Sequence, residues 1–327
     1  MVFIAIGMAR IRDLFAVAML SGIYSLLAAV LYVTMDAVDV AFTEAAVGAG
    51  IATVLMLGTL ALTTTKEKIV PRRIGPFAIV LLTGAALLYG TLDMPPYGDP
   101  DAPANHHVAP RYIEKSGAEV GMPNIVTSVL ASYRGYDTLG EVAVIFTAAV
   151  GVLLLMGRHL AIHRRQHKKI IEIGKPMIFK SILRVTSKLL IPLILLFALY
   201  VQFHGDYGPG GGFQAGVIFS SAFILYALIF GIDNARKVFP MWLLRFLLAA
   251  GVLIYAGVGV ASLILGGNFL DYSVLAKDPI AGQHLGIFLI ELGVGTTVAA
   301  AMATIFFIFA GQSHERRSEP RENNGKF

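Results

Sequence analysis

The sequence predicts an all-α polytopic membrane protein with about eight transmembrane helices and both termini in the cytoplasm. Of its 327 residues, 56% are hydrophobic and only 14% are charged, which lies well outside the composition of ordinary soluble domains. Apolar runs long enough to cross a bilayer as a helix recur along the whole chain. Basic residues fall in the connections between these runs, in an alternation that sets the orientation.

The apolar runs define eight expected transmembrane helices, which are 14–34, 41–63, 76–92, 138–157, 186–204, 213–232, 241–265 and 284–310. Lys and Arg precede the first span and follow the second, fourth, sixth and eighth, whereas the connections on the other side carry few cations. Because cytoplasmic loops are enriched in Lys and Arg, both termini are placed in the cytoplasm. The first run is too long for a signal-peptide core and lacks a small-residue cleavage site, so we interpret it as a retained anchor.

Polar segments divide the chain into parts. Segment 93–137 is rich in Pro, Asp, Asn and His, and we interpret it as an irregular outer loop with a short helix near 121–137 along the membrane surface. Segment 158–180 is a basic cytoplasmic linker, and the polar tail 312–327 is predicted to be disordered. The absence of Cys excludes disulfides and thiol chemistry, and the net charge of +5 sits in short loops, so it does not indicate nucleic-acid binding.

The connection between the first two spans, "MDAVDVAFTEAAVGAG", carries three acids. If the second helix runs back to Asp36, then Asp36, Asp39 and Thr43 share one face. Their oxygens would suit a proton or a hard cation such as sodium. The alternative is a turn with Asp as the helix cap and Glu44 in the first turn. Small residues after Glu44 permit close helix contact, which makes a buried carboxylate there a stronger functional candidate.

Two later spans also carry acids. Glu141 lies near the start of the fourth span, after Asp137 and Thr138, and is either a functional carboxylate or part of a capping box. Glu291 lies in the last span, seven residues after His284, so that both share a helix face. A His–Glu pair can relay protons, whereas a His near an interface is more often a polar anchor.

Four basic residues, Lys180, Arg184, Lys188 and Arg245, lie near the cytoplasmic ends of their spans. Long cationic side chains at such positions reach the polar interface. Lys188 is the deepest of them, and the alternative for it is a position facing a cavity.

The stretch "HGDYGPGGGFQAG", His204–Gly216, separates the fifth and sixth spans. A phosphate-binding loop would need a following Lys-Ser/Thr, which is absent. A channel filter would usually be repeated, and nothing here repeats. The remaining interpretation is a tight outer hairpin, in which Gly permits close packing or positive φ and Pro209 fixes one turn position.

Three of these motifs resemble one family. "GPGGGFQAGVI" resembles the signature of the MnhB/MrpB-like subunit, the B type, of Mrp-type multisubunit cation/proton antiporters. "DVAFTEAAVGAG" resembles the C-terminal region of their large A-type subunit, and "NIVTSVLASYRGYDTLGEVAV" resembles the segment that follows it there. The chain therefore looks like a four-helix B-type domain, 181–311, extended by a three-helix region, 1–92, and by 93–157, an outer loop with one transmembrane helix.

The resemblance implies a transporter subunit rather than an enzyme, in the bacterial cytoplasmic membrane. The implied assembly is related to respiratory complex I and exchanges Na⁺ or Li⁺ for protons. It is expected to hold no cofactor or resident metal. The implied partners are subunits of types A, C, D, E, F and G. The implied ion path contains Glu44, Asp39, Asp36, Glu141 and Asp137, to which we add Glu291 with less support. The B-type motif, with a role in assembly or helix positioning, is Pro209, Gly210, Gly211, Gly212 and Phe213. The alternatives are a membrane subunit of a hydrogenase-like redox-driven pump and a scaffold that only joins its neighbours.

Overall fold

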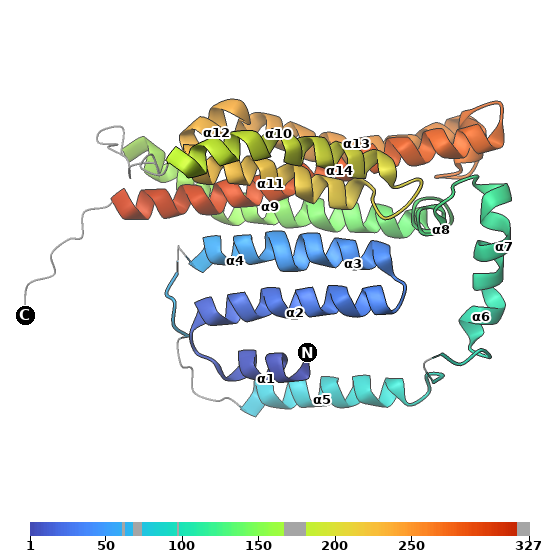
Figure 1. Cartoon of the computed structure of the whole chain (residues 1–327), viewed down its shortest axis with the longest axis horizontal. Coiled ribbons are helices and arrows are strands. Elements are labelled where there is room, and N and C mark those ends of the chain that lie inside the picture. The colour runs from blue at the N-terminus through green and yellow to red at the C-terminus, as the bar shows by residue number, and fades with distance from the viewer. Residues whose placement is uncertain (61–62, 68–73, 97, 167–180, 319–327) are drawn as a thin grey trace, which may run out of the picture.

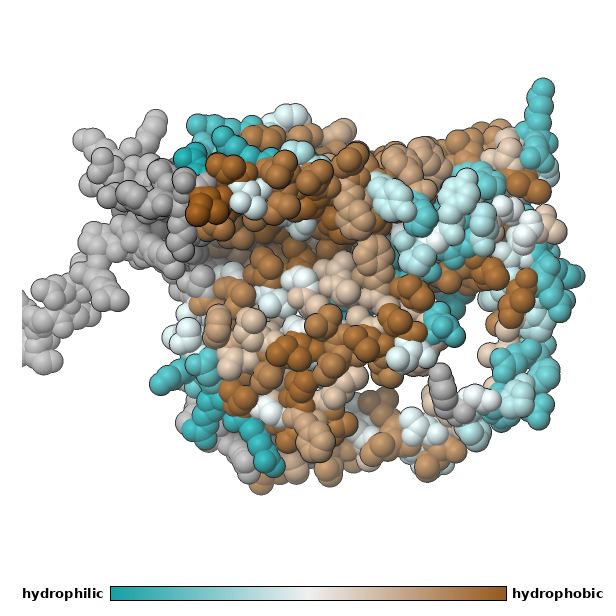
Figure 2. All heavy atoms as spheres, viewed as in Figure 1, coloured by the Kyte–Doolittle hydropathy of each residue, from teal (hydrophilic) through white to brown (hydrophobic). Residues whose placement is uncertain are grey.

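The computed structural model describes residues 1–60, 63–67, 74–96, 98–166 and 181–318. The regular elements of these segments are all helices, and eight of the helices are long and apolar enough to cross a membrane. This confirms the all-α fold class and the expected number of spans. Figure 1 shows the long helices lying side by side, with their connections gathered at the two ends of the molecule. Figure 2 shows an apolar surface between hydrophilic ends on the same face, as expected of a membrane-spanning chain.

The C-terminal bundle is built around α14 (Pro279–Ser318), which is the most buried of the described spans. Helices α9 (Gly135–Gln166), α11 (Gly212–Phe230) and α13 (Met241–Ile264) pack against it, and α10 (Ser181–His204) packs mainly against α11. The short helix α12 (Ile232–Val238) links α11 to α13 after a break at Gly231. Ile287, Ile290 and Phe307 of α14 are fully buried together with Tyr255 of α13, so this bundle holds most of the apolar core.

The N-terminal helices form a second group. Helix α1 (Val2–Arg10) precedes α2 (Leu14–Thr34), and the Asp13 side chain caps the start of α2. The second span consists of α3 (Val38–Glu44), a π-helix η1 (Ala45–Ala52) and α4 (Thr53–Leu60). It packs against α2 on one side and against α11 and α14 on the other, so it joins the two groups. The sequence predicted a single helix here and gave no indication of the π-helix.

Helix α5 (Ile74–Thr91) stands apart from both groups. It has no buried residue in the described part of the chain, and Figure 1 shows it on the far side of α1 and α2 from the bundle. Its side chains are almost uniformly apolar. This span therefore presents nearly all of its surface to whatever surrounds the chain.

The outer segment contains more helix than expected. Helices α6 (Pro103–His107) and α7 (Ala109–Glu119) occupy a stretch that composition predicted to be irregular, and each has a Pro in its first turn, where Pro is well tolerated. The expected short helix is present as α8 (Ile125–Thr127) and a π-helix η2 (Ser128–Tyr133). It runs across the end of the bundle (Figure 1) and buries Thr127, Ser128 and Ala131, so it is a packed element rather than an exposed surface helix.

Two expected boundaries were wrong. Helix α9 continues to Gln166, so the first part of the expected linker 158–180 is helical, and the remainder, with Lys180, lies outside the described residues. Helix α14 continues to Ser318, although disorder was expected from residue 312. In both places the helix extends beyond its apolar run into polar sequence, because backbone hydrogen bonding does not require apolar side chains. The end of the tail, 319–327, lies outside the described residues.

Candidate functional site

A cleft of about 630 Å³ lies where α3, α8, η2, α9, α14 and the glycine loop between α10 and α11 meet. Three of the expected ion-path carboxylates line it: Asp39 from α3, Glu141 from α9 and Glu291 from α14. Thr43, Thr127, Thr138 and Gln214 add polar groups to a lining that is otherwise mostly apolar. The fold thus brings together acids from three distant parts of the chain.

The glycine loop binds two of these carboxylates through its backbone. Gly210 donates its N–H to Oδ1 of Asp39 at 3.3 Å, and Gly212 donates its N–H to Oε2 of Glu291 at 2.8 Å. Between them, Gly211 donates to the carbonyl of Val201 at 3.0 Å, which ties the loop to the end of α10. The loop is therefore a pair of anion-binding amides held on a short hairpin.

Glycine is required at two positions here. Gly211 has φ +112°, which residues with a side chain rarely adopt, and a Cβ there would lie 2.9 Å from Oε2 of Glu291. A Cβ on Gly212 would collide with the carbonyl oxygen of Glu291, so α11 approaches the backbone of α14 directly at this point. The hairpin interpretation agrees with this geometry, and the loop also binds side chains that the sequence did not connect to it.

Gln214 is a polar residue that the sequence analysis missed. Its side chain is only 6% exposed and donates from Nε2 to Oγ1 of Thr43 at 2.7 Å. The Thr43 hydroxyl in turn donates to the carbonyl of Asp39 at 3.0 Å. The available signal was a Gln in the first turn of an apolar span, where burying even an uncharged amide is unfavourable without hydrogen-bond partners.

Side chains at the start of α8 hold the glycine loop in place through hydrogen bonds. The Asn124 side-chain amide donates to the carbonyls of Gly205 and Gly208, at 3.2 and 3.1 Å, and the Thr127 hydroxyl donates to the Gly205 carbonyl at 2.6 Å. These bonds satisfy loop carbonyls that would otherwise have no partner among the described residues. The position of the glycine loop, and with it the two carboxylates, depends on this outer segment.

Glu141 is exposed on the chain's own surface, on the wall of the cleft formed by α9. The capping-box alternative is wrong, because α9 begins at Gly135 and a capping glutamate would lie three residues after the cap. Thr138 donates its hydroxyl to the carbonyl of Leu130 at 2.8 Å, and Asp137 forms an ion pair with Arg134, with Nε and Oδ2 2.6 Å apart. Asp137 therefore lies outside the cleft and is neutralised locally.

Asp36 and Glu44 do not line the cleft. Helix α3 begins at Val38 and Asp36 sits in the preceding turn with φ +57°, so the expected shared face of Asp36, Asp39 and Thr43 is wrong for Asp36. Glu44 faces α2 instead: a Cβ on Gly48 would lie 2.5 Å from Oε1 of Glu44 and 2.6 Å from Oγ of Ser25. The close helix contact expected at the small residues after Glu44 is present there.

Asp206, in the turn before the glycines, is a further acid that sequence analysis did not single out. Burial raises the pKa of the Asp206 carboxyl, and the nearby His284 opposes this shift. The His284 ring also lies close to Gly121, where a Cβ would be 3.2 Å from its Nε2. His284 thus contacts the outer segment, as a polar anchor near an interface would.

The basic residues Arg184, Lys188 and Arg245 lie away from the cleft. The Arg184 guanidinium sits over the ring of Phe230, 5.5 Å from its centroid. Lys188 and Arg245 are exposed on the surfaces of α10 and α13, and neither is among the residues that line the cleft. The alternative that Lys188 faces this cavity is therefore wrong.

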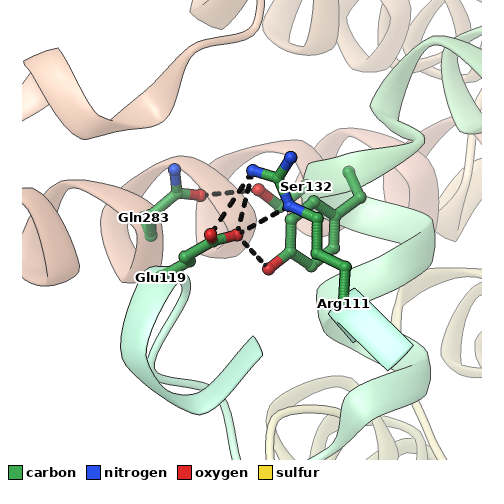
Figure 3. A network of polar contacts seen from close by, with 5 residues as sticks. Arg111, Glu119, Ser132 and Gln283 are labelled. Carbon is green, nitrogen blue, oxygen red and sulfur yellow. Dashed lines mark hydrogen bonds and ion pairs between the residues drawn. The ribbon is translucent and has the colours of Figure 1, made fainter. Parts of the chain in front are cut away.

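A polar network attaches α7 to η2, which forms one wall of the cleft. Figure 3 shows Arg111 and Glu119 facing one another, with Ser132 and Gln283 joined beside them. Glu119 accepts a hydrogen bond from the Tyr133 hydroxyl at 2.6 Å, which with Arg111 lowers the pKa of Glu119. Burial and this bond raise the pKa of Tyr133 to about 12. Ser132 donates to Oε1 of Gln283 at 2.8 Å, linking η2 to α14 as well.

The fold and the cleft define a multi-pass helical membrane protein with carboxylates gathered beside its spanning helices, and sequence comparison places it more narrowly. Residues 182–304 match the family described as a domain related to the MnhB subunit of Na⁺/H⁺ antiporters. The antiporter subunit mnhB2 of Staphylococcus aureus strain Newman is 36% identical over 133 residues, which are 94% of that protein and 40% of this chain. The chain belongs to this MnhB-related family through its C-terminal region.

The N-terminal part matches two other families. Residues 1–65 match MbhD, the D-type MBH subunit, and residues 72–167 match MbhE, the E-type MBH subunit. These matches replace the expectation that 1–92 corresponds to the C-terminal part of the A-type antiporter subunit. The two matched ranges adjoin between α4 and α5.

Two solved structures resemble the fold. A chain of the Mrp complex from Dietzia sp. DQ12-45-1b superposes with a TM-score of 0.69 and 25% identity over 98% of this chain. This chain spans about a third of that one, 34% of its length. A chain of the membrane-bound sulfane sulfur reductase, an archaeal respiratory membrane complex, superposes with a TM-score of 0.51 and 28% identity, covering 71% of this chain and 96% of that one.

Proposed function

We propose that the chain is a membrane subunit of a multisubunit Na⁺(Li⁺)/H⁺ antiporter that exports monovalent cations in exchange for protons, driven by the proton motive force. It would reside in the bacterial cytoplasmic membrane, with both termini in the cytoplasm and with subunits of types A, C, D, E, F and G as partners. The observation that carries the proposal is the convergence of Asp39, Glu141 and Glu291 on one cleft. Family membership of the C-terminal region supports it.

The chemistry follows from the surroundings of these groups. A carboxylate within a transmembrane segment is costly as a free anion and is stabilised by binding a proton, a cation or hydrogen-bond donors. Glu291 has one loop amide as a donor, and Asp39 has one loop amide and the Asn124 side chain, so that part of each charge is offset and the remainder is left for an ion. Such groups can exchange a proton for a cation as water reaches them.

We place Glu44 in the continuation of the path. It follows Asp39 on the same span and lies between that span and α2, next to the π-helix η1. π-Helical segments are frequent at functional sites, because the widened turn re-aims side chains and leaves carbonyls less tightly bonded. Asp36 and Asp137 are left out of the path, since one lies in an exposed turn and the other is paired with Arg134.

The test is Na⁺/H⁺ exchange in everted vesicles that contain the complete complex. Asp39→Asn, Glu141→Gln and Glu291→Gln should each reduce exchange by about tenfold or more at unchanged amounts of assembled complex, because each removes one ionisable group from the path. Asp137→Asn serves as the matched control and should leave exchange near the wild-type rate. Normal exchange by all three cleft variants would contradict the proposal.

A second candidate is a membrane subunit of a redox-driven ion pump. The matches of residues 1–65 and 72–167 to MBH subunits, and the resemblance to a chain of a respiratory sulfane sulfur reductase complex, favour it. The two candidates differ in what drives the ions. Exchange that proceeds with a proton gradient alone supports the antiporter, whereas ion movement that requires an electron donor, in a complex that purifies with iron–sulfur subunits, supports the pump.

A further inference from the structure

Asp39 and Glu291 are held close together by one short piece of backbone. Their amide partners, Gly210 and Gly212, are two residues apart, so the two nitrogens can be separated by no more than about 7 Å. Each amide occupies one carboxylate oxygen, and Oε1 of Glu291 accepts no hydrogen bond from the described residues. The Asn124 side chain also reaches the Asp39 carboxylate, and the charges of Asp39 and Glu291 lie near enough to interact. Oε1 of Glu291 therefore remains available to a ligand in the cleft.

The Gln214 side chain supplies a third oxygen. The Thr43 hydroxyl gives its proton to the Asp39 carbonyl, so Oγ1 of Thr43 can only accept from Gln214, and the amide of Gln214 must present its NH₂ group there. This fixes Oε1 on the other side of the amide. No donor among the described residues reaches that oxygen, although the residue is only 6% exposed and lines the cleft. Because Gln214 lines the cleft, this oxygen is open to the cleft, where an ion or water can meet it.

We propose that Oε1 of Gln214 and the carboxylates of Asp39 and Glu291 form a binding site for a dehydrated monovalent cation, Na⁺ or Li⁺, at the glycine loop. This inference rests on the antiporter function proposed above and assigns its cation to a particular set of atoms. Carboxylate and amide oxygens are the ligands that hard cations prefer. Gln214 acts as a neutral ligand whose position is set by Thr43.

Charge balance favours a monovalent ion. Two carboxylates among spanning helices are neutralised by two protons, or by one proton and one monovalent cation, and these two states differ by the exchange of one proton for one cation. A neutral third ligand contributes to coordination without disturbing this balance. Because Gln214 is fixed and buried, its oxygen would favour ions of one size over others, which makes it a determinant of selectivity.

The test measures the concentration dependence of exchange in everted vesicles that contain the complete complex, with Na⁺, Li⁺ and K⁺ each supplied as the chloride. Gln214→Leu should raise the apparent KM for Na⁺ by about tenfold or more and change the preference among the three ions, because one of the few direct ligands is lost. Gln202→Leu is the matched control: Gln202 lies on α10 beside Gly295, outside the cleft, and its loss should leave KM and ion preference unchanged. Unchanged KM and preference in Gln214→Leu would overturn the inference.

Two further measurements test the cation site if the Gln214→Leu complex fails to assemble. Gln214→Asn keeps the amide but withdraws its oxygen by one methylene, and it should shift ion preference at normal complex levels. Titration of the purified complex with NaCl should give a saturable heat of binding that MgCl₂ does not reproduce and that the Gln214→Asn complex shows only at higher concentration. Wild-type ion preference and an unaltered titration in Gln214→Asn, or saturable binding of Mg²⁺ in place of Na⁺, would contradict the site.

Failure of this inference is distinguishable from failure of the proposed function. If Asp39→Asn and Glu291→Gln abolish exchange while the Gln214 variants keep wild-type KM and ion preference, the carboxylates carry ions and the assigned cation site is wrong. If the carboxylate variants exchange Na⁺ for protons normally, the proposed ion path is wrong, and the proposed cation site is then wrong as well.

Discussion

The backbone N–H of Gly212 donates to Oε2 of Glu291 at 2.8 Å, so the first residue of α11 binds the one acid of the last span directly. The amide of a helix N-terminus is a favourable partner for an anion, because it is not used within the helix. The contact explains why the loop is rich in glycine: a side chain at Gly211 or Gly212 would occupy the space of the carboxylate or of the α14 backbone. The same glycines thus allow α11 to pack closely against α14 and provide an amide that binds the Glu291 carboxylate.

Gly211→Ala should destabilise the protein by about 1–3 kcal/mol, since φ +112° is strongly unfavourable for any residue with a side chain. The new methyl group would also press against Glu291. A lower Tm of the purified complex and less assembled complex in the membrane are the expected results. Gly84→Ala is the matched control, because Gly84 lies within α5 with open space around it, and its Tm should be equal or higher.

Asp39→Asn and Asp36→Asn should behave differently although the residues are three apart. Asp39 lines the cleft and accepts from Gly210, so its neutral replacement should reduce Na⁺/H⁺ exchange by about tenfold or more at normal complex levels. Asp36 lies in an exposed turn with φ +57°, a conformation that Asn tolerates well, so exchange should be unchanged. Equal losses in both variants would mean that the turn, rather than the cleft, is the functional element.

The attachment of the outer segment should be sensitive to acid. The hydrogen bond from Tyr133 lowers the pKa of Glu119 in the folded protein, so its contribution to stability is present above the unfolded pKa of about 4.3 and is lost as the pH falls through the lower folded value. Tyr133→Phe removes the main cause of this shift. Limited proteolysis of α7 should be faster in Tyr133→Phe than in the wild type at pH 7, with the difference shrinking on acidification below about pH 4. A difference that persists unchanged at low pH would contradict this role.

Thr43→Val tests how Gln214 is positioned. The substitution keeps the shape of the side chain and removes the oxygen that accepts from Gln214 at 2.7 Å. The Gln214 amide would then keep only its long hydrogen bond to the Asp39 carbonyl, at 3.5 Å, and would be held less firmly. We therefore expect altered preference among Na⁺, Li⁺ and K⁺ with complex levels near normal. Thr147→Val is the matched control, since the Thr147 hydroxyl bonds only within its own helix and is exposed, and its ion preference should equal that of the wild type.

Hydropathy predicted the number and approximate place of the spans because the bilayer allows few alternatives: each crossing must be a helix that satisfies its own backbone. The glycine motif likewise indicated a hairpin, since no side chain fits between α11 and α14 at Gly212. The acidic candidates Asp39, Glu141 and Glu291 stood out because charges are rare in such sequence, and the fold brings these three to one cleft.

Other features of the fold and the cleft could not be predicted from the local sequence. The π-helices Ala45–Ala52 and Ser128–Tyr133 differ from α-helices only in hydrogen-bond spacing, which composition does not encode. Gly210 and Asp39 are 171 positions apart in the sequence. The hydrophobic periodicity within either segment therefore could not predict the hydrogen bond between them. Asp36 was misplaced because the start of α3 is set by a left-handed turn that Asp adopts without a glycine to mark it.

Glu291→Gln shows whether the carboxylates of the cleft carry the exchanged ions. Gln keeps the shape of the side chain and an oxygen that can accept from Gly212, and it removes the charge. The measurement is the rate of Na⁺-dependent proton release from everted vesicles that contain the complete complex, compared with wild type at equal amounts of assembled complex. We expect a loss of about tenfold or more. A wild-type rate in a fully assembled Glu291→Gln complex would contradict it.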